Sequence, residues 1–400
     1  MRSNSIFTFR SLLRRSPLLP GESLSSLVAR LAILNGYSSL SILERLFQSY
    51  YFVRGACFLQ EDELIRLAVL TGIPYDDLLD SSDVHFRQKP SRVSCSDESF
   101  SSGVIAFRPT QATWYCPKCL AEVAYHRLIW RPISSAVCLK HACQLVNNCP
   151  QCKRPVSIYD VVLKRCSYCH RDLSKVNTVG LQGSEQGLLA QTTMQKWLNN
   201  CSVPNLNWPQ QDPLVLCLLA EGLAFGIVYF SLHHTHPGIQ NLTCKNGGKR
   251  NLMQQLSPLE VIQVYSLAVQ YMVNWPEGFR SFLYWCEPDP KHDFSKRVKT
   301  LMSYLAQNLW NSDSCLFIWN AFHTYSDDRL CYTRGYPEFT FEKLPAYANS
   351  YETAQILGVL DGFLPSFAEK KLLIPARIWQ KRDLNFFYKR EDLRNLSQYI

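Results

Sequence analysis

The chain has 400 residues, which is enough for two to four domains, and its 46% apolar content excludes intrinsic disorder as a general description. Its 42 Lys and Arg residues exceed its 33 Asp and Glu residues, which gives a formal charge of +9. A basic excess of this size favours an acidic partner such as nucleic acid, but the position of the charge along the chain matters more than the total.

Residues 1–20 are a basic arm. They contain Arg2, Arg10, Arg14 and Arg15 and no acidic residue. An apolar core and a small-residue cleavage site, which mark a secretory signal, are both missing from this stretch. We therefore interpret residues 1–20 as an arm and not as a targeting segment.

Residues 21–83 are predicted to form a small bundle of the helix-turn-helix type. Apolar residues at helical spacing predict helices over 24–34, 38–47 and 61–70 and a short one over 76–79. The last third is acidic, with only Arg66 to offset Glu61, Asp62, Glu63, Asp76, Asp77, Asp80 and Asp83. We expect so acidic a surface to repel phosphate.

A Ser- and Arg-rich linker, residues 84–112, leads to a cysteine-rich module over 113–175 that holds eight of the 16 cysteines. The module contains two complete four-ligand sets: Cys116, Cys119, Cys138 and His141, followed by Cys149, Cys152, Cys166 and Cys169. A two-residue gap lets both side chains of a pair face one ion, and two such pairs close a tetrahedron. We predict two small β zinc ribbons holding two structural Zn²⁺ ions.

The pairing of these ligands stays open at the level of sequence. Cys143, His126 and His170 lie close enough in the chain to substitute, although ligation within each adjacent set is our first choice. Thiols that bind metal remain free in a reducing compartment, so we expect a cytoplasmic protein. Cysteines outside the module, such as Cys217 and Cys286, are expected to be small buried hydrophobes.

The module is also basic. Ten Lys and Arg residues face three acidic ones, and the net charge of +7 falls to +4 when seven thiolates and two dications are included. Contact with phosphate is one interpretation of this charge. A structural scaffold is the interpretation that we favour.

Residues 176–345 are predicted to form a helical domain. Helical spacing recurs over 194–198, 214–232, 259–273 and 298–322. The stretch 214–232 is long and apolar enough to span a bilayer, but it contains Glu221, and an ionisable group in mid-membrane is costly. We therefore expect a buried helix and no membrane contact.

Residues 346–400 are predicted to form a C-terminal helix-turn-helix with a basic tail. The pattern indicates a helix from Tyr351, a turn at Gly358 and a second helix opened by Asp361. Basic residues interleaved with aromatic ones follow, and we predict that they contact nucleic acid or an effector complex: Lys370, Lys371, Arg377, Lys381, Arg382, Lys389 and Arg390. A solvated face of a structural unit is the alternative. The predicted fold class is thus mainly α with small β zinc ribbons.

Several motifs resemble the TniQ/TnsD family of transposition target selectors over residues 17–175. They are Pro20-Gly-Glu-Ser-Leu24, Leu70-Thr-Gly-Ile-Pro74, Tyr115-Cys-Pro-Lys-Cys119 and Cys138-Leu-Lys-His141. The resemblance implies no bond-making chemistry, and it carries the family's zinc ligands to the eight positions above. It also implies a link between a target-recognition system and an AAA+ ATPase regulator with its transposase. Short relatives serve as adaptors on CRISPR effector complexes with guide RNA, commonly as head-to-tail dimers.

Two other functions compete with the adaptor role. The first is a stand-alone, site-specific selector that reads target DNA with the C-terminal residues. The second is a zinc-dependent nuclease or deaminase, which needs an open zinc position and a nearby general base. The closed four-ligand spacing disfavours the second, and we predict no catalytic residue.

Overall fold

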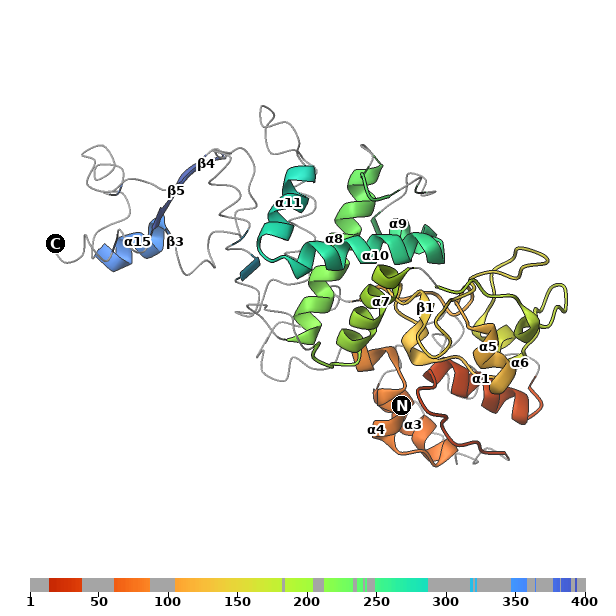
Figure 1. Ribbon diagram of the computed structural model, residues 1–400. Coiled ribbons are helices and arrows are strands. Elements are labelled where there is room, and N and C mark those ends of the chain that lie inside the picture. Colours follow the sequence, from red (N-terminus) through yellow and green to blue (C-terminus); the bar gives the residue numbers. More distant parts are fainter. Residues whose placement is uncertain are drawn as a thin grey trace, which may run out of the picture. The chain divides into compact units, whose positions relative to one another are not determined.

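The computed structural model is mainly helical (Figure 1). It describes residues 14–37, 61–86, 105–181, 184–203, 212–232, 236–239, 249–286, 347–357, 377–381 and 383–389 and positions 242, 317, 318, 321, 364 and 393. The chain divides into two compact units. Unit 1 comprises residues 1–94, 104–204 and 227–269, and unit 2 comprises 95–103, 205–226 and 270–400.

The N-terminal helices are α1 (Leu24–Leu34), α3 (Glu61–Thr71) and α4 (Tyr75–Asp80), followed by the 3₁₀ helix η2 (Asp83–Phe86). Their apolar faces share one core, which contains Leu24, Leu27, Leu31, Leu64, Leu67 and Leu78. Ser23 caps α1 by accepting a hydrogen bond from the backbone of Ser26. These helices confirm the predictions over 24–34, 61–70 and 76–79, whereas the predicted helix over 38–47 lies outside the described residues.

The N-terminal helices pack on the cysteine-rich module within unit 1. The backbone N–H of Ser23 donates to the carbonyl of His126 at 2.9 Å, and Leu128 N–H donates to the Gly21 carbonyl at 2.8 Å. Helix α1 packs against α6 (Ile158–Leu163), as Figure 1 shows. The predicted boundaries at 83 and 113 remain predictions, but the two segments that they separate are in direct contact.

A buried polar network holds this junction. His126 is fully buried; its Nδ1 lies 3.0 Å from Ser23 Oγ and its Nε2 lies 2.8 Å from Thr113 Oγ1. Its backbone N–H donates to Ser26 Oγ at 2.9 Å. Burial, followed by the charges of Arg131 and Arg108, lowers the pKa of His126 well below 6.5, so the ring is neutral.

Two charged residues that were assigned to the surface or to the linker are in fact buried. Asp83, predicted to belong to an acidic surface, pairs with Arg131 at 2.7 Å, and both side chains are almost fully buried. That prediction was wrong for Asp83, because the charge is matched inside the fold and not presented to solvent. Arg108, in the predicted linker, donates to the carbonyls of Trp130 and Ile133 and stacks on Trp114.

The module itself contains short elements joined by turns. They are α5 (Pro117–Glu122), η3 (Leu128–Trp130), β1 (Val137–Cys138), β2 (Cys143–Gln144), α6 and η4 (Leu173–Lys175). Helix α7 (Glu185–Leu198) packs on β1 through buried amides: Gln195 donates to the Val137 carbonyl, and Gln191 bonds to both Ser134 and Ala136. A helix predicted to belong to the next domain therefore supports the module.

The remaining long helices are α8 (Pro213–Ser231), α9 (Lys249–Gln255), α10 (Pro258–Val273) and α11 (Glu277–Cys286). Helices α8 and α10 confirm the predictions over 214–232 and 259–273. Helix α8 is long and apolar enough to cross a membrane, but 78% of its most apolar window is buried inside the protein. That burial is typical of a core helix of a soluble protein. Cys217 and Cys286 are buried, as expected.

The C-terminal region contains a sheet that the sequence analysis did not predict. Strands β3 (Tyr347–Asn349), β4 (Arg377–Lys381) and β5 (Asp383–Lys389) pair antiparallel in the order β3-β5-β4, next to α15 (Ser350–Leu357). The expected basic tail over 377–389 is therefore a β-hairpin, with Ile378 opposite Phe386. Aromatic and β-branched residues favour strands, and an interpretation of them as interleaved contacts alone leaves this preference out. Position 361, the expected start of the second helix, lies outside the described residues.

The buried neutral ring of His126 predicts a loss of stability in mild acid. The unfolded chain takes up a proton near pH 6.5 and the folded chain does not, so stability falls as the pH drops below that value. At pH 6.0 the loss is about 1 kcal/mol relative to pH 7.5. Urea unfolding at the two pH values should show this loss in the wild type and in His170→Gln, which changes an exposed ring, but not in His126→Gln. An equal loss in His126→Gln would contradict the prediction.

Candidate metal centre

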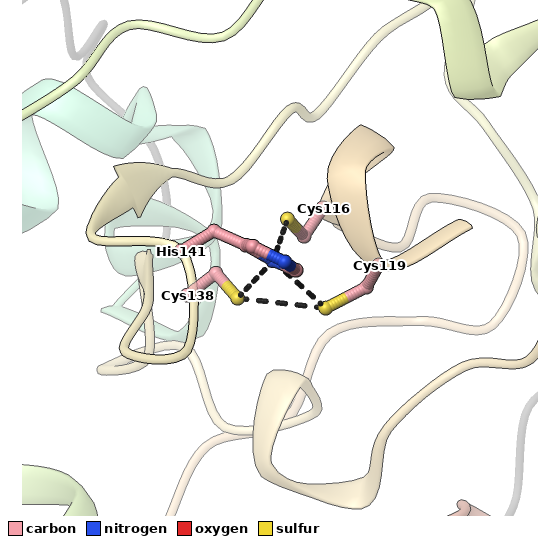
Figure 2. Close-up of side chains that lie close together, drawn as sticks. All are labelled: Cys116, Cys119, Cys138 and His141. Carbon is pink, nitrogen blue, oxygen red and sulfur yellow. Dashed lines mark hydrogen bonds between the residues drawn. The ribbon is translucent and has the colours of Figure 1, made fainter. Parts of the chain in front are cut away.

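The first predicted ligand set comes together around one point (Figure 2). Cys116 is the N-cap of α5 and Cys119 lies in its first turn, while Cys138 ends β1 and His141 lies in the turn before β2. The Nδ1 atom of His141 lies 3.4, 3.3 and 3.6 Å from the sulfurs of Cys116, Cys119 and Cys138. The sulfurs of Cys119 and Cys138 are 3.6 Å apart. All four donor atoms lie within 4.8 Å of one another.

The second predicted set is as compact. The sulfurs of Cys149 and Cys169 are 3.4 Å apart, and those of Cys152 and Cys166 are 3.7 Å apart. Again all four donor atoms lie within 4.8 Å of one another. The structure thus brings together each of the two sets as the spacing predicted, without exchange of ligands between them.

The three alternative ligands have different surroundings. His126 is held by Ser23 and Thr113, away from both sets. His170 is exposed and does not belong to either set. Cys143 is the exception: it is buried opposite Cys138 in the β1–β2 pair, and its sulfur lies 3.7 Å from that of Cys116. It is placed to hydrogen-bond to the first set as a neighbouring thiol.

The donor geometry fits a tetrahedral zinc ion. Zn–S bonds of about 2.3 Å place two sulfurs of a tetrahedron about 3.8 Å apart, and a sulfur and an imidazole nitrogen slightly closer. The separations of 3.3–3.7 Å in both sets agree with these values. Cys₃His and Cys₄ are donor sets typical of structural zinc, and four protein donors leave no position for water. An ion bound there would hold the fold together without activating a nucleophile.

The second set has backbone N–H groups directed at its sulfurs. Burial raises the pKa of Cys149, but hydrogen bonds from the N–H groups of Cys152 and Gln151 outweigh it and lower the pKa to about 7. Burial raises the pKa of Cys166 to about 12 despite similar bonds from Cys169 and Tyr168. Four thiolates packed this closely repel one another, and a bound dication compensates their charge. Metal binding is therefore expected to release protons from this set.

Glu122 is a functional residue that sequence reasoning missed. Its Oε1 lies 3.0 Å from Nε2 of His141, on the side of the ring opposite the three sulfurs, and its other oxygen accepts from Lys140. Hydrogen bonds from Lys140 and then from His141 lower the pKa of Glu122, so it is a carboxylate at neutral pH. A carboxylate at Nε2 keeps the proton there and leaves Nδ1 free to bind metal. The sequence signal for this role was its position, three residues after the ligand Cys119.

The N-terminal helices and the first part of the cysteine-rich module match a known family. Residues 13–145 match the family model described as TniQ. This match, over a third of the chain, supports membership of the TniQ family. The matched range contains α1, α3, α4 and the first metal set, and it ends before Cys149. A comparison with curated proteins gives no match.

A TniQ match implies a target-selection role associated with transposition, together with transposition machinery and DNA. The predicted C-terminal contact residues are separate from the metal centre in sequence. Arg377 and Lys381 are the ends of β4, and Lys389 is the last residue of β5. Lys370, Lys371, Arg382 and Arg390 lie outside the described residues, so their role remains a prediction.

Two closed sets predict two zinc ions per chain. Replacement of Cys149 by Ser should reduce this to one, because three donors and a hydroxyl no longer match zinc. Cys143→Ser is the matched control and should keep both ions, since the first set is complete without it. Chelation should unfold the module, because a structural zinc stabilises it by about 10 kcal/mol. Elemental analysis gives the zinc content, and a value near zero in intact, soluble protein would rule out the two sites.

The Glu122–His141 bond predicts that Glu122 tunes the first site. Removal of the carboxylate in Glu122→Ala should weaken zinc binding at that site by about 10- to 100-fold, because the His141 ring loses its orientation. Glu122→Gln, whose amide oxygen still accepts from Nε2, should restore part of the affinity. Competition with a chromogenic chelator measures both variants, with the exposed Asp62→Ala as control. Equal zinc affinity in Glu122→Ala and Asp62→Ala would contradict this role.

Proposed function

We propose that this TniQ protein is a transposition target-selection adaptor. It links a CRISPR RNA-guided effector complex to the AAA+ ATPase regulator and, through it, to the transposase, and so directs insertion of transposon DNA. The observation that carries the proposal is the TniQ match over residues 13–145, which unites the helical bundle and the first metal set. That match supports a role in target selection, and the specific partners are part of the proposal.

The metal chemistry supports a connector and not an enzyme. Each set offers four protein donors within 4.8 Å, so an ion held there is closed to water and substrate. We propose that both ions are structural Zn²⁺ and that the protein acts in the cytoplasm, where the thiols stay reduced. A nuclease or deaminase would need a site with an open coordination position.

The proposed mechanism is multivalent coupling. A connector bound to an effector complex raises the local concentration of the ATPase at one DNA locus, with effective concentrations that reach the millimolar range, ~1 mM for short flexible links. A head-to-tail homodimer would double the number of contacts. A rigid connector makes this coupling stronger, because less conformational freedom is lost when the second partner binds.

A stand-alone selector is the second candidate. Arg377, Lys381 and Lys389 lie on the β4–β5 hairpin, and two-stranded ribbons are among the elements that proteins use to read DNA. In that case the purified chain would retain one DNA sequence without RNA or partners. In the adaptor role, sequence choice comes from the guide RNA and the chain itself shows no such preference.

The adaptor role predicts specific co-purification. A tagged chain, expressed with its neighbouring genes and treated with nuclease, should recover an AAA+ ATPase and a guide-containing effector complex at low salt. Cys116→Ser/Cys119→Ser, which dismantles the first metal set, should recover neither, while Cys143→Ser should recover both. Light scattering of the purified chain should give twice the 46.1 kDa of one copy.

Recovery of no ATPase and no guide RNA by the intact chain would overturn the adaptor proposal. Retention of a single DNA site by that same preparation, without partners, would favour the stand-alone selector. Mass spectrometry and RNA sequencing of the recovered material separate these outcomes.

A further inference from the structure

The second metal set is built from two hairpins with the same backbone pattern. In the first, Cys149 N–H donates to the Arg154 carbonyl at 2.9 Å, and Lys153 N–H donates back to Cys149 at 2.8 Å. In the second, Cys166 pairs in the same way with Arg171 at 3.0 Å, and His170 N–H donates to Cys166 at 2.9 Å. Both hairpins therefore place an arginine directly opposite their first ligand.

The side chains around these hairpins are basic and exposed. We call the exposed residues that flank the four ligands the knuckle surface: Lys153, Arg154, Arg165, Tyr168, His170 and Arg171. Tyr168 is 58% exposed, and the guanidinium of Arg154 lies 4.2 Å from the centre of its ring. The stacked pair joins one hairpin to the other, so an aromatic ring and several cations share one surface.

The carboxylates nearby leave this charge uncompensated. Residues 146–175 contain only two acidic residues, Asp160 and Asp172. Asp160 is 2% exposed and accepts hydrogen bonds from Ser157 and Ser167, while Asp172 is turned toward Ser174 and Lys175.

Within the described part of the chain, the ion pairs found include none of the four Lys and Arg residues of the knuckle surface. The first metal set differs, because its exposed Lys140 is hydrogen-bonded to Glu122. Four thiolates with one dication remove two charges from the +4 of residues 146–175, so the segment stays positive.

We propose that the knuckle surface binds the sugar-phosphate backbone of nucleic acid. Guanidinium groups match phosphate oxygens in charge and geometry, and exposed aromatic rings pack against sugars or unstacked bases. The four ligands hold both hairpins in place, so little backbone freedom is lost on binding. A freely solvated basic face would not need the stacking of Arg154 on Tyr168 or the symmetric placement of Arg154 and Arg171.

The inference rests on the proposed function for the source of the nucleic acid, which is either target DNA or guide RNA. Both offer the same phosphodiester chemistry. Nucleic acid would thus contact the two hairpins of the second metal set, in addition to the C-terminal basic residues that the sequence singles out.

The test is fluorescence anisotropy on the full zinc-loaded chain with three probes: a 30-base-pair DNA duplex, its single strand and the same sequence as RNA. The triple variant Arg154→Ala/Arg165→Ala/Arg171→Ala should bind at least about tenfold more weakly at 0.1 M salt and should reduce the salt slope by about three phosphate contacts. The matched control, Arg14→Ala/Lys118→Ala/Lys196→Ala, removes the same charge from other exposed positions and should bind as the wild type does.

Tyr168→Ala distinguishes the source. A loss confined to the two single strands indicates stacking on unpaired bases, as in guide RNA, whereas an equal loss on all probes indicates backbone contact alone, as with duplex DNA. Zinc content of two per chain verifies that each variant is folded. If the triple variant does not fold, hydrogen exchange on the wild type replaces it, and amides of residues 149–171 should gain protection when the duplex or RNA is added.

Equal affinity and equal salt slope in the triple variant and the control would overturn the proposal, as would absent protection of residues 149–171. The same assay with labelled poly-glutamate tests for an acidic protein partner. If the triple variant loses affinity for poly-glutamate but not for DNA or RNA, the proposal is also overturned. Recovery of the ATPase by the triple variant after nuclease treatment tests the adaptor role separately, so failure of one proposal does not imply failure of the other.

Discussion

The closure of two four-donor sets is the constraint on which the rest of this protein depends. Residues 116–169 form short helices, two-residue strands and turns, and a segment of this size gains only marginal stability from apolar burial. A structural zinc contributes about 10 kcal/mol or more, against a total stability of about 5–15 kcal/mol for a typical domain. Bound ions would therefore decide whether this segment has a structure, and the segment in turn supports the elements around it.

The N-terminal helices depend on the module through buried polar contacts. His126 is bonded on both ring nitrogens, to Ser23 at the start of α1 and to Thr113 at the start of the module. The pair of Arg131 with Asp83 joins the same two segments, and it is specific because an unmatched buried charge is costly. The TniQ match over 13–145 crosses this junction, which agrees with one folded unit. The proposed connector would transmit position between partners only if its own parts are fixed.

The two metal sets are alike in chemistry and different in surface. Around the first, Glu122 accepts a hydrogen bond from Lys140 and orients His141, so the carboxylate near the site compensates the charge of Lys140. Around the second, Arg154 and Arg171 are exposed, and the carboxylates of Asp160 and Asp172 are hydrogen-bonded to serines. The same fold element therefore stabilises in one place and offers a charged surface in the other.

The sequence by itself was enough to predict the two four-residue clusters, the TniQ resemblance and the long helices. Ligand spacing and helical periodicity are local, so Cys116 through Cys169 and the helices near Leu24, Leu214 and Leu259 follow from neighbouring residues. Only the tertiary structure decided which polar residues are paired. Asp83, Glu122 and Arg108 find partners far away in the chain, and β3 finds β5 across some 40 residues. Such pairings depend on which segments fold against each other, and no short-range pattern records that choice.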